Sequence, residues 1–258
     1  MTKRERRTPP VSAWLTQSLR VTAFPVPTAE YDAIAWWELL FGEAPEKRQS
    51  HPRLGDSQDE GPFADGQLSL KAQPLRLDWL YAAGETAAQQ GDRLPVLGPF
   101  LESREPFAKM VSQWFSLPSC PPLRRFAFGA VLFQFVEDRE DGYRQISAYL
   151  PAVKLDAKGS SDFSYQINRP RDSRSGVPGL QVNRLCRWSV AQLMHAQVSL
   201  SDAGVQKTEL GSHFACRLEM DINTSAEFRG ELSPEQSKIV FGELLELGAE
   251  IAQQGDIP

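Results

Sequence analysis

The side chains best suited to recognition chemistry are arginines and asparagines gathered in residues 162–188. Two strand-like segments of this stretch each carry an apolar residue followed by Asn and Arg, and a loop rich in Arg, Ser and Gly joins them. Guanidinium groups form paired hydrogen bonds with phosphates and carboxylates. In a protein of formal net charge −5, the stretch predicts an electropositive site for an anionic partner. The candidate binding residues are Asn168, Arg169, Arg171, Arg174, Asn183, Arg184 and Arg187.

The same residues have a structural alternative. If the two segments pair antiparallel across the loop, Asn168 and Asn183 come close together, with Arg169 and Arg184 beside them. Such a group can bind a phosphate or a carboxylate surface. It can equally tie down the loop through hydrogen bonds to carbonyl groups of the same segment. The sequence leaves both alternatives open.

Histidines and cysteines are the candidates for metal and thiol chemistry. Cys186 and His195 lie on one predicted strand, about 30 Å apart and on opposite faces. His213 and Cys216 also face opposite sides of a predicted strand, so neither pair has the spacing of metal ligands. Together with Cys120, these cysteines are predicted to be buried free thiols in a reducing compartment. The sequence predicts no metal site and no cofactor.

Carboxylates are the remaining candidates for catalysis. Glu219 and Asp221 align with Arg217 and Asn223 on one face of a predicted strand, but apolar residues fill the intervening positions. This is the alternation of a half-exposed strand, so we interpret the row as a solvated face. The chain also lacks the Gly-rich phosphate loop, the Gly-x-Ser-x-Gly elbow and the Gly-x-Gly-x-x-Gly turn. No catalytic residues are predicted, and an enzyme is the less favoured class.

Hydrophobic patterning predicts the elements that position these residues. Alternating apolar residues predict strands over 18–24, 68–72, 75–81, 126–136, 162–168, 181–200 and 212–222. Apolar stripes and capping residues predict helices over 28–42, 100–115 and 138–150, and a last helix between Ser233 and Gly255. Its predicted inward residues are Ile239, Val240, Leu244, Leu247 and Ile251. The strand over 126–136 is apolar at both alternations, which predicts cover on both faces. The polar segments 43–66 and 83–95 are predicted loops.

These elements predict an α+β fold with an antiparallel-rich sheet and about four principal helices. The order strand, helix, strands, helix occurs in both halves of the chain, which favours a pseudo-duplication. The alternative is that the two halves share this order of elements by chance within a single α+β sheet. Residues 1–12 are predicted to be a disordered basic tail, and the halves 13–120 and 121–258 to pack as one unit.

Composition and charge limit the class of protein. With 41% hydrophobic and 24% charged residues, the chain has the make-up of a soluble globular protein. No run reaches the roughly 18 to 20 apolar residues that cross a membrane, and the basic N-terminal residues lead into prolines rather than an apolar signal core. We therefore expect a cytoplasmic protein. A pI near 5.4 excludes a nucleic-acid binder that uses its whole surface.

The sequence thus predicts a non-catalytic cytoplasmic interaction or regulatory protein of the adaptor type, with an acidic protein surface as its partner. The Arg/Asn-rich hairpin makes the polar contact, and Trp36 adds an exposed apolar one, because Trp37 turns inward about 100° away on the same helix. The alternative is a binding or sensor module for a phosphorylated ligand, a nucleotide or single-stranded nucleic acid. It would use the same arginines with Tyr165 and Trp188 as aromatic neighbours.

Overall fold

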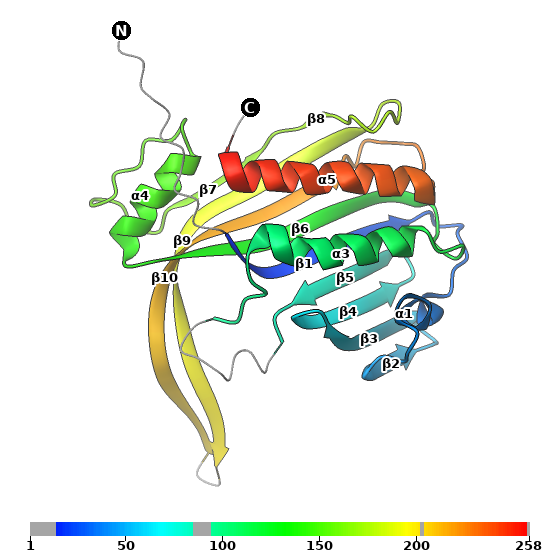
Figure 1. Ribbon diagram of the computed structural model, residues 1–258, viewed down its shortest axis with the longest axis horizontal. Coiled ribbons are helices and arrows are strands. Elements are labelled where there is room, and N and C mark those ends of the chain that lie inside the picture. Colours follow the sequence, from blue (N-terminus) through cyan, green and yellow to red (C-terminus); the bar gives the residue numbers. More distant parts are fainter. Residues whose placement is uncertain (1–13, 85–93, 202–203, 257–258) are drawn as a thin grey trace.

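One antiparallel sheet organises the molecule. The structure is a computed structural model that describes residues 14–84, 94–201 and 204–256. Within these ranges, the side chains of residues 194–211 are not described. These residues form a ten-stranded sheet with four α-helices, which confirms the predicted α+β fold (Figure 1). Among them, no helix is long and apolar enough to cross a membrane. The predicted tail, 1–12, lies outside the described residues.

The strands are β1 (Leu15–Pro25), β2 (Lys47–His51), β3 (Asp56–Phe63), β4 (Gly66–Gln73), β5 (Arg76–Ala82), β6 (Leu123–Val136), β7 (Ser164–Asn168), β8 (Arg171–Asp172), β9 (Gln181–Ser201) and β10 (Gly204–Thr224). The helices are α1 (Trp36–Phe41), which follows the 3₁₀ turn η1 (Ala33–Ala35), α3 (Phe100–Phe115), α4 (Arg139–Tyr149) and α5 (Pro234–Gln254). The strand order is β2-β3-β4-β5-β1-β6-β10-β9-β7, and β8 pairs with β9.

The two predicted halves meet at the centre of the sheet. Their first strands, β1 and β6, pair antiparallel, so the sheet continues from one half into the other. Their last helices, α3 and α5, contact each other, and Arg104 of α3 donates to the carbonyl oxygen of Leu245 at 3.0 Å. The order of elements agrees with the pattern behind the predicted duplication. The duplication itself stays a prediction.

The hydrophobic core lies between the sheet and the helices. Alternate residues of each central strand face it, as Leu19 and Val21 do on β1 and Phe126 and Phe128 on β6. Tryptophans pack together where α1 and α3 meet β5. Trp114 of α3 packs edge to face with Trp36 and Trp79, at 5.5 and 6.2 Å between ring centroids. Offset and edge-to-face pairs of this kind add stability beyond the burial of their area.

Trp36 corrects one prediction. Its side chain is 0% exposed, and its indole nitrogen donates to Ser119 at 2.9 Å. Trp37 is also buried and packs on Trp79 of β5. The helix α1 therefore has two covered sides, because it contacts the sheet through Trp37 and the neighbouring helix α3 through Trp36. The prediction of an exposed apolar contact at Trp36 is wrong.

The last helix follows its sequence signals. Ser233 and Gln236 form a capping box, and Gly255 ends the helix at a φ of 82°. The core face runs through Val240, Leu244, Leu247 and Ile251. Ile239 was predicted to point inward but is 58% exposed, because it lies about 100° around the helix from Val240.

The segment 43–66 also differs from its prediction. It was predicted to be a loop, but it forms β2 and β3, which pair antiparallel at the edge of the sheet. Polar contacts hold this hairpin. Arg48 of β2 contacts Asp59 of β3 at 2.8 Å and Glu38 of α1 at 3.0 Å, and the Asp59 side chain is 2% exposed. Hydrophobic alternation cannot reveal a hairpin whose central cross-strand contact is an ion pair.

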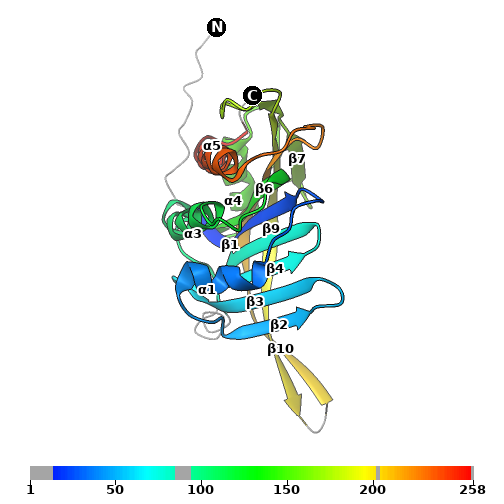
Figure 2. The same cartoon turned by 90° about the vertical axis from the view of Figure 1, so that its right-hand side faces the viewer.

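All four helices lie on one face of the sheet. Figure 2 shows α1, α3 and α5 together on one side of the strands. The helix α4 lies on the same side. Cys216 of β10 donates to the carbonyl oxygen of Gly142 in α4, and Cys216 lies on the same face of β10 as the core residue Leu218. Within the described ranges no helix covers the opposite face. We call this the open sheet face, meaning the strand side chains that point away from the helices.

From Phe126 to Val131, the central strand β6 is consequently covered on one side only, while Phe133, further along the open sheet face, is buried. Phe126 and Phe128 face the helices, whereas Ala127, Gly129 and Val131 alternate with them and lie on the open sheet face, half-buried. The predicted cover on both faces is wrong at these positions. Small and branched side chains on the solvent side account for the misleading apolar pattern.

The strands β9 and β10 extend past the body of the sheet as a two-stranded hairpin (Figure 1). The pairing of β9 with β7 ends at Ser189, and that of β10 with β6 at Phe214. From there to the tip, the two strands pair only with each other among the described residues. His195 lies in this outer part, beyond the described side chains.

Candidate binding surface

The predicted arginine and asparagine hairpin has the expected pairing. The strands β7 and β9 are antiparallel, with Ile167 opposite Cys186. Asn168 donates to Asn183 at 3.0 Å, Asn183 donates to Asn223 at 3.1 Å, and Asn223 donates to Asp221 at 3.0 Å. The predicted approach of Asn168 and Asn183 is confirmed. These amides form a ladder across three strands, and their oxygens also accept hydrogen bonds from the Arg184 backbone amide and the Arg125 side chain.

Arg169 and Arg184 point toward the helices. Arg169 donates to both carboxylate oxygens of Asp256, at 2.5 and 2.8 Å, and the Asp256 side chain is 4% exposed. This hydrogen-bonded cation holds the pKa of Asp256 below its ordinary value. Arg184 is buried and donates to the carbonyl oxygen of Arg169 at 2.9 Å, and burial lowers the pKa of Arg184. Arg169 therefore fixes the chain after β7 to the end of α5, and Arg184 fixes it to β9.

Glu243 of α5 fixes the loop that follows. Its carboxylate, 7% exposed, accepts hydrogen bonds from the Ser173 hydroxyl at 2.6 Å and the Arg174 backbone amide at 3.0 Å. Arg171 contacts the same carboxylate at 3.4 Å. A carboxylate that several donors share is a strong anchor. The contact of Arg184 with the Arg169 carbonyl matches the structural alternative stated for this segment. Arg169 and Arg171 tie the segment down differently, through carboxylates of Asp256 and Glu243.

The two other predicted arginines keep exposed side chains but lie apart. Arg174 is exposed on the loop beside α5, and Arg187 is 51% exposed on the open sheet face. The aromatic neighbours named for stacking nucleic-acid bases face inward. Trp188 is 0% exposed and stacks on Tyr149, and the Tyr165 hydroxyl donates to Asp256. The hairpin therefore does not gather its predicted binding residues into one exposed cluster.

The open sheet face gathers basic side chains from both halves of the chain. Strand register places its residues in rows, since positions directly opposite one another share a face. The basic residues of this face are Arg20, Lys47, Lys71, Arg76, Arg125, Arg187 and Arg217, and the acidic ones are Asp56, Glu60, Asp78, Asp172, Glu219 and Asp221. Among the described side chains the bases of this face outnumber its acids by one, although the whole chain has a net charge of −5. This face is therefore slightly basic on an acidic protein.

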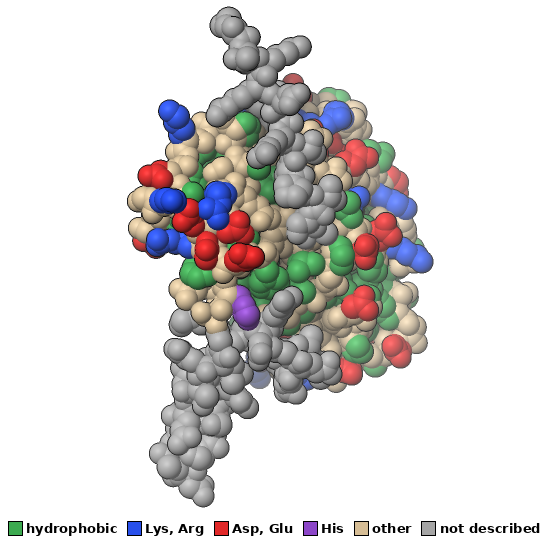
Figure 3. All heavy atoms as spheres, turned by 60° about the vertical axis from the view of Figure 1, so that its left-hand side comes forward, with side chains coloured by type: hydrophobic (Ala, Val, Ile, Leu, Met, Phe, Trp, Pro, Cys, Tyr) green, Lys and Arg blue, Asp and Glu red, His purple; other side chains and the backbone are tan. Residues whose placement is uncertain are grey.

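On the helix side of the sheet, the surface of α4 carries acidic and basic side chains in pairs. Over α4, Figure 3 shows acidic side chains gathered beside basic ones. Arg144 of α4 contacts Glu140 at 2.8 Å and Asp141 at 3.8 Å, so acids of the same helix compensate it. Exposed pairs of this kind contribute little to stability. They do lower the attraction that this surface exerts on an anion.

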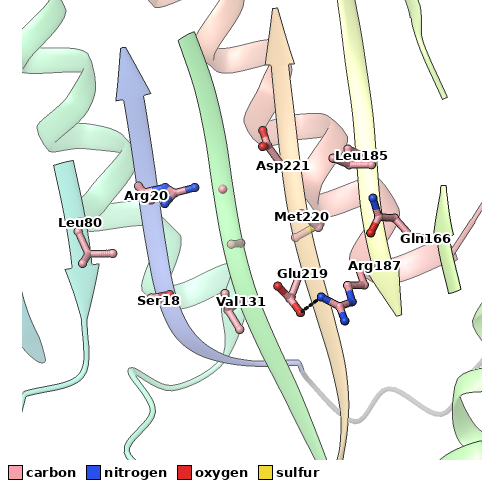
Figure 4. Close-up of a pocket in the computed structure, with 12 residues that line it drawn as sticks. Ser18, Arg20, Leu80, Val131, Gln166, Leu185, Arg187, Glu219, Met220 and Asp221 are labelled. Atoms are coloured by element: carbon pink, nitrogen blue, oxygen red, sulfur yellow. Dashed lines mark ion pairs between the residues drawn. The ribbon is translucent and has the colours of Figure 1, made fainter. Parts of the chain in front are cut away.

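A hollow of about 360 Å³ lies at the centre of the open sheet face (Figure 4). Gly129 of β6 lies at its middle, with Arg20 of β1 opposite on one side and Asp221 of β10 opposite on the other. Arg20 points from its strand toward β6, and Arg187 points toward Glu219 (Figure 4). The hollow therefore has a glycine floor and a charged rim.

The rim charges differ in how far they are neutralised. Glu219 lies 3.0 Å from Arg217 and 3.9 Å from Arg187, in ion pairs whose geometry is not that of hydrogen bonds. Asp221 accepts a hydrogen bond from Asn223. Arg20 is exposed and makes no ion pair with any residue that the structure describes. The guanidinium of Arg20 is thus the rim cation that a ligand can pair.

Arg20, Arg76, Arg125, Arg217 and the lysines of this surface were not among the predicted binding residues. Apart from Lys47, which lies in the polar strand β2, each of them is next to an apolar residue of a strand, as Arg20 is between Leu19 and Val21. That pattern places a basic side chain on the solvent face. It does not reveal that the strands concerned are neighbours in one sheet.

Other chemistry has little to build on in the described part of the chain. No three His, Cys, Asp or Glu side chains there come together in a way that could hold a metal ion. Cys120, Cys186 and Cys216 are buried free thiols, as predicted, and burial raises the pKa of each to about 12. Such thiols are poor nucleophiles at neutral pH. No protein-family model matches the chain, and no curated protein matches it in sequence.

Proposed function

We propose that this protein is a non-catalytic interaction or regulatory protein, and that it binds an acidic segment of a partner protein on the open sheet face. The observation that carries the proposal is the excess of basic side chains on the one face without helices. An uncovered face is common in antiparallel sheets and is not evidence of a site by itself. Its charge, opposite to that of the whole chain, is the feature that needs an explanation.

Electrostatics supports an acidic partner in particular. Like charges keep an acidic segment away from the rest of a protein of net charge −5, while the open sheet face attracts it. Complementary charge of this kind raises association rates and suppresses wrong partners. Arg20 and Arg187 are the central contacts in this proposal, with Arg217 held close by through Glu219. Free buried thiols fit a reducing compartment, so we place the protein in the cytoplasm as part of the same proposal.

A binding titration tests the proposal. The probe is a fluorescein-labelled peptide of about ten residues rich in Glu and Asp, which is long enough when extended to cross the central strands. We expect the double variant Arg20→Glu/Arg187→Glu to weaken binding by at least about 2 kcal/mol, measured by fluorescence anisotropy. Arg139→Glu/Arg144→Glu, the same two changes at exposed sites on α4, is the matched control and should alter binding by less than about 0.5 kcal/mol.

The same titration distinguishes the alternative of a nucleic-acid or phosphate ligand. A thymidine oligonucleotide and ATP replace the peptide at about 50 mM and about 200 mM salt. Preferential oligonucleotide binding, with a steep loss between these concentrations, would replace the acidic protein partner by single-stranded nucleic acid. Equal peptide affinity for the double variant and the control would remove the open sheet face as the site.

A further inference from the structure

We infer that the hollow above Gly129 receives one carboxylate side chain of the acidic partner, and that Arg20 forms its ion pair. The inference rests on the proposed function and specifies the chemical group that the site takes. Three observations support it. They are a glycine without a structural requirement, an unpaired guanidinium beside it and a rim of charges already satisfied elsewhere.

Gly129 has no structural reason to be glycine. Its φ is not in the left-handed region, where glycine is favoured. A Cβ atom at this position would lie 3.5 Å from the Met220 carbonyl oxygen and 3.9 Å from Arg20, which are ordinary contacts. Glycine in the interior of a central strand costs stability, and it often marks a place where a ligand approaches the backbone closely. The missing side chain leaves the hollow open.

The charges of the rim select a single negative group. Arg20 lies directly across from Gly129 and is unpaired among the described residues, whereas Arg187 and Arg217 share Glu219. A carboxylate matches the two-pronged geometry of one free guanidinium. A phosphate dianion would carry more charge toward Glu219 and Asp221, and like charges at this range repel. The hollow therefore fits a carboxylate better than a phosphate.

Neutral groups complete the site. Ser18 and Gln166 line the hollow on opposite sides and can donate hydrogen bonds to a carboxylate oxygen. Leu80 and Leu185 also line it and offer apolar contact to the methylene groups of an acidic side chain. The hollow thus provides one cation, neutral donors and a short apolar wall. These are the elements that a partly desolvated Glu or Asp side chain requires.

Three variants test the inference with the labelled acidic peptide described above. Gly129→Leu fills the hollow, Gly129→Ala leaves most of it open, and Arg20→Gln removes the charge while keeping much of the side-chain volume. We expect Gly129→Leu and Arg20→Gln each to weaken binding by about tenfold or more, and Gly129→Ala by less than about threefold. Circular dichroism and thermal unfolding establish that each variant is folded.

A second measurement needs no substitution. In protein labelled with ¹⁵N-glycine, the Gly129 amide resonance should shift as the acidic peptide is added, while that of Gly242, on α5, should not. A peptide with every Glu and Asp changed to Gln and Asn should leave Gly129 unmoved. An unshifted Gly129 in the presence of bound acidic peptide would overturn the inference, whether or not Gly129→Leu folds.

The outcomes separate the inference from the proposed function. If Arg20→Glu/Arg187→Glu abolishes binding while Gly129→Leu and Arg20→Gln bind as the wild type does, the acidic partner uses the open sheet face but not this hollow. If none of these variants changes the affinity, both proposals fail.

Discussion

At the scale of single residues, the face of a strand decides what each arginine does. Arg169 and Arg184 lie on the helix side, where Asp256 and a backbone carbonyl satisfy them. Arg187, on the alternate positions of β9, lies on the open sheet face and is 51% exposed. Residues with the same side chain, close in sequence, therefore serve folding in one case and lie exposed on the surface in the other.

The ion pair of Arg169 predicts a loss of stability that depends on pH. Arg169→Ala leaves the buried Asp256 carboxylate without its cation, so we expect the free energy of unfolding at pH 7 to fall by about 2 kcal/mol. The pKa of Asp256 is lowered in the folded protein, so its stabilisation is complete above the ordinary Asp value of about 3.9 and is lost as the pH falls through the folded pKa. The difference between wild type and variant should shrink over that range.

Urea unfolding at several pH values measures this difference. Arg174→Ala, in the neighbouring loop, is the matched control, because its side chain is exposed; its effect should stay within about 0.5 kcal/mol. An Arg169→Ala variant as stable as wild type at pH 7 would contradict the scaffolding role.

The cysteines allow a second prediction at this scale. Burial raises the pKa of Cys120, Cys186 and Cys216 to about 12, so only about one thiol in ten thousand is ionised at pH 8. We expect no measurable reaction of the native protein with Ellman's reagent on the timescale in which a free thiol reacts. All three should react once urea unfolds the chain. Rapid modification of the native protein would show that a thiol is accessible.

At the scale of elements, α5 is the anchor for the arginine-rich loop. Glu243 and Asp256, one within the helix and one just after it, hold residues 169–174. The capping box and the final glycine that define this helix are sequence signals, and both were predictable. Its carboxylates gave no such signal, because nothing in their spacing relates them to a loop about 70 residues earlier.

The anchor predicts protease resistance. Glu243→Ala removes the acceptor for Ser173 and the Arg174 amide, so the loop should open locally more often. We expect trypsin to cleave after Arg171 or Arg174 at least about tenfold faster than in the wild type, as measured by mass spectrometry over time. Glu246→Ala, an exposed site on the same helix, is the control. Equal cleavage in both variants would show that Glu243 does not hold the loop.

The elements that were predictable share one property. Strands β1, β4 and β5 alternate polar and apolar residues, and α3 has a continuous apolar stripe, so local patterns were sufficient. The hairpin of β2 and β3 was missed because Arg48 and Asp59 join it, rather than an apolar face. The burial of Trp36 was missed because the apolar stripe of a helix shows which side packs on the sheet. The stripe does not show that another side packs on a neighbouring helix, as Trp36 does on α3.

At the scale of the whole molecule, the sequence placed an electropositive site within residues 162–188, whereas the basic side chains of the open sheet face come from strands in both halves of the chain. Arg187 was recognised, whereas Arg20, which lies about 170 residues away, was not. Both line one hollow because β1, β6, β10 and β9 are consecutive strands of one sheet. Strand order of this kind depends on long-range pairing, and local patterns do not determine it. The site therefore requires the fold to be known.

Chemical protection of arginines tests the central claim most directly. Wild-type protein is treated with phenylglyoxal, with and without the acidic peptide, and each modified arginine is quantified by mass spectrometry. We predict that the peptide protects Arg20 and Arg187, whereas Arg139 and Arg144 of α4 react equally in both conditions. Protection of Arg139 and Arg144 with undiminished modification of Arg20 and Arg187 would contradict binding on the open sheet face.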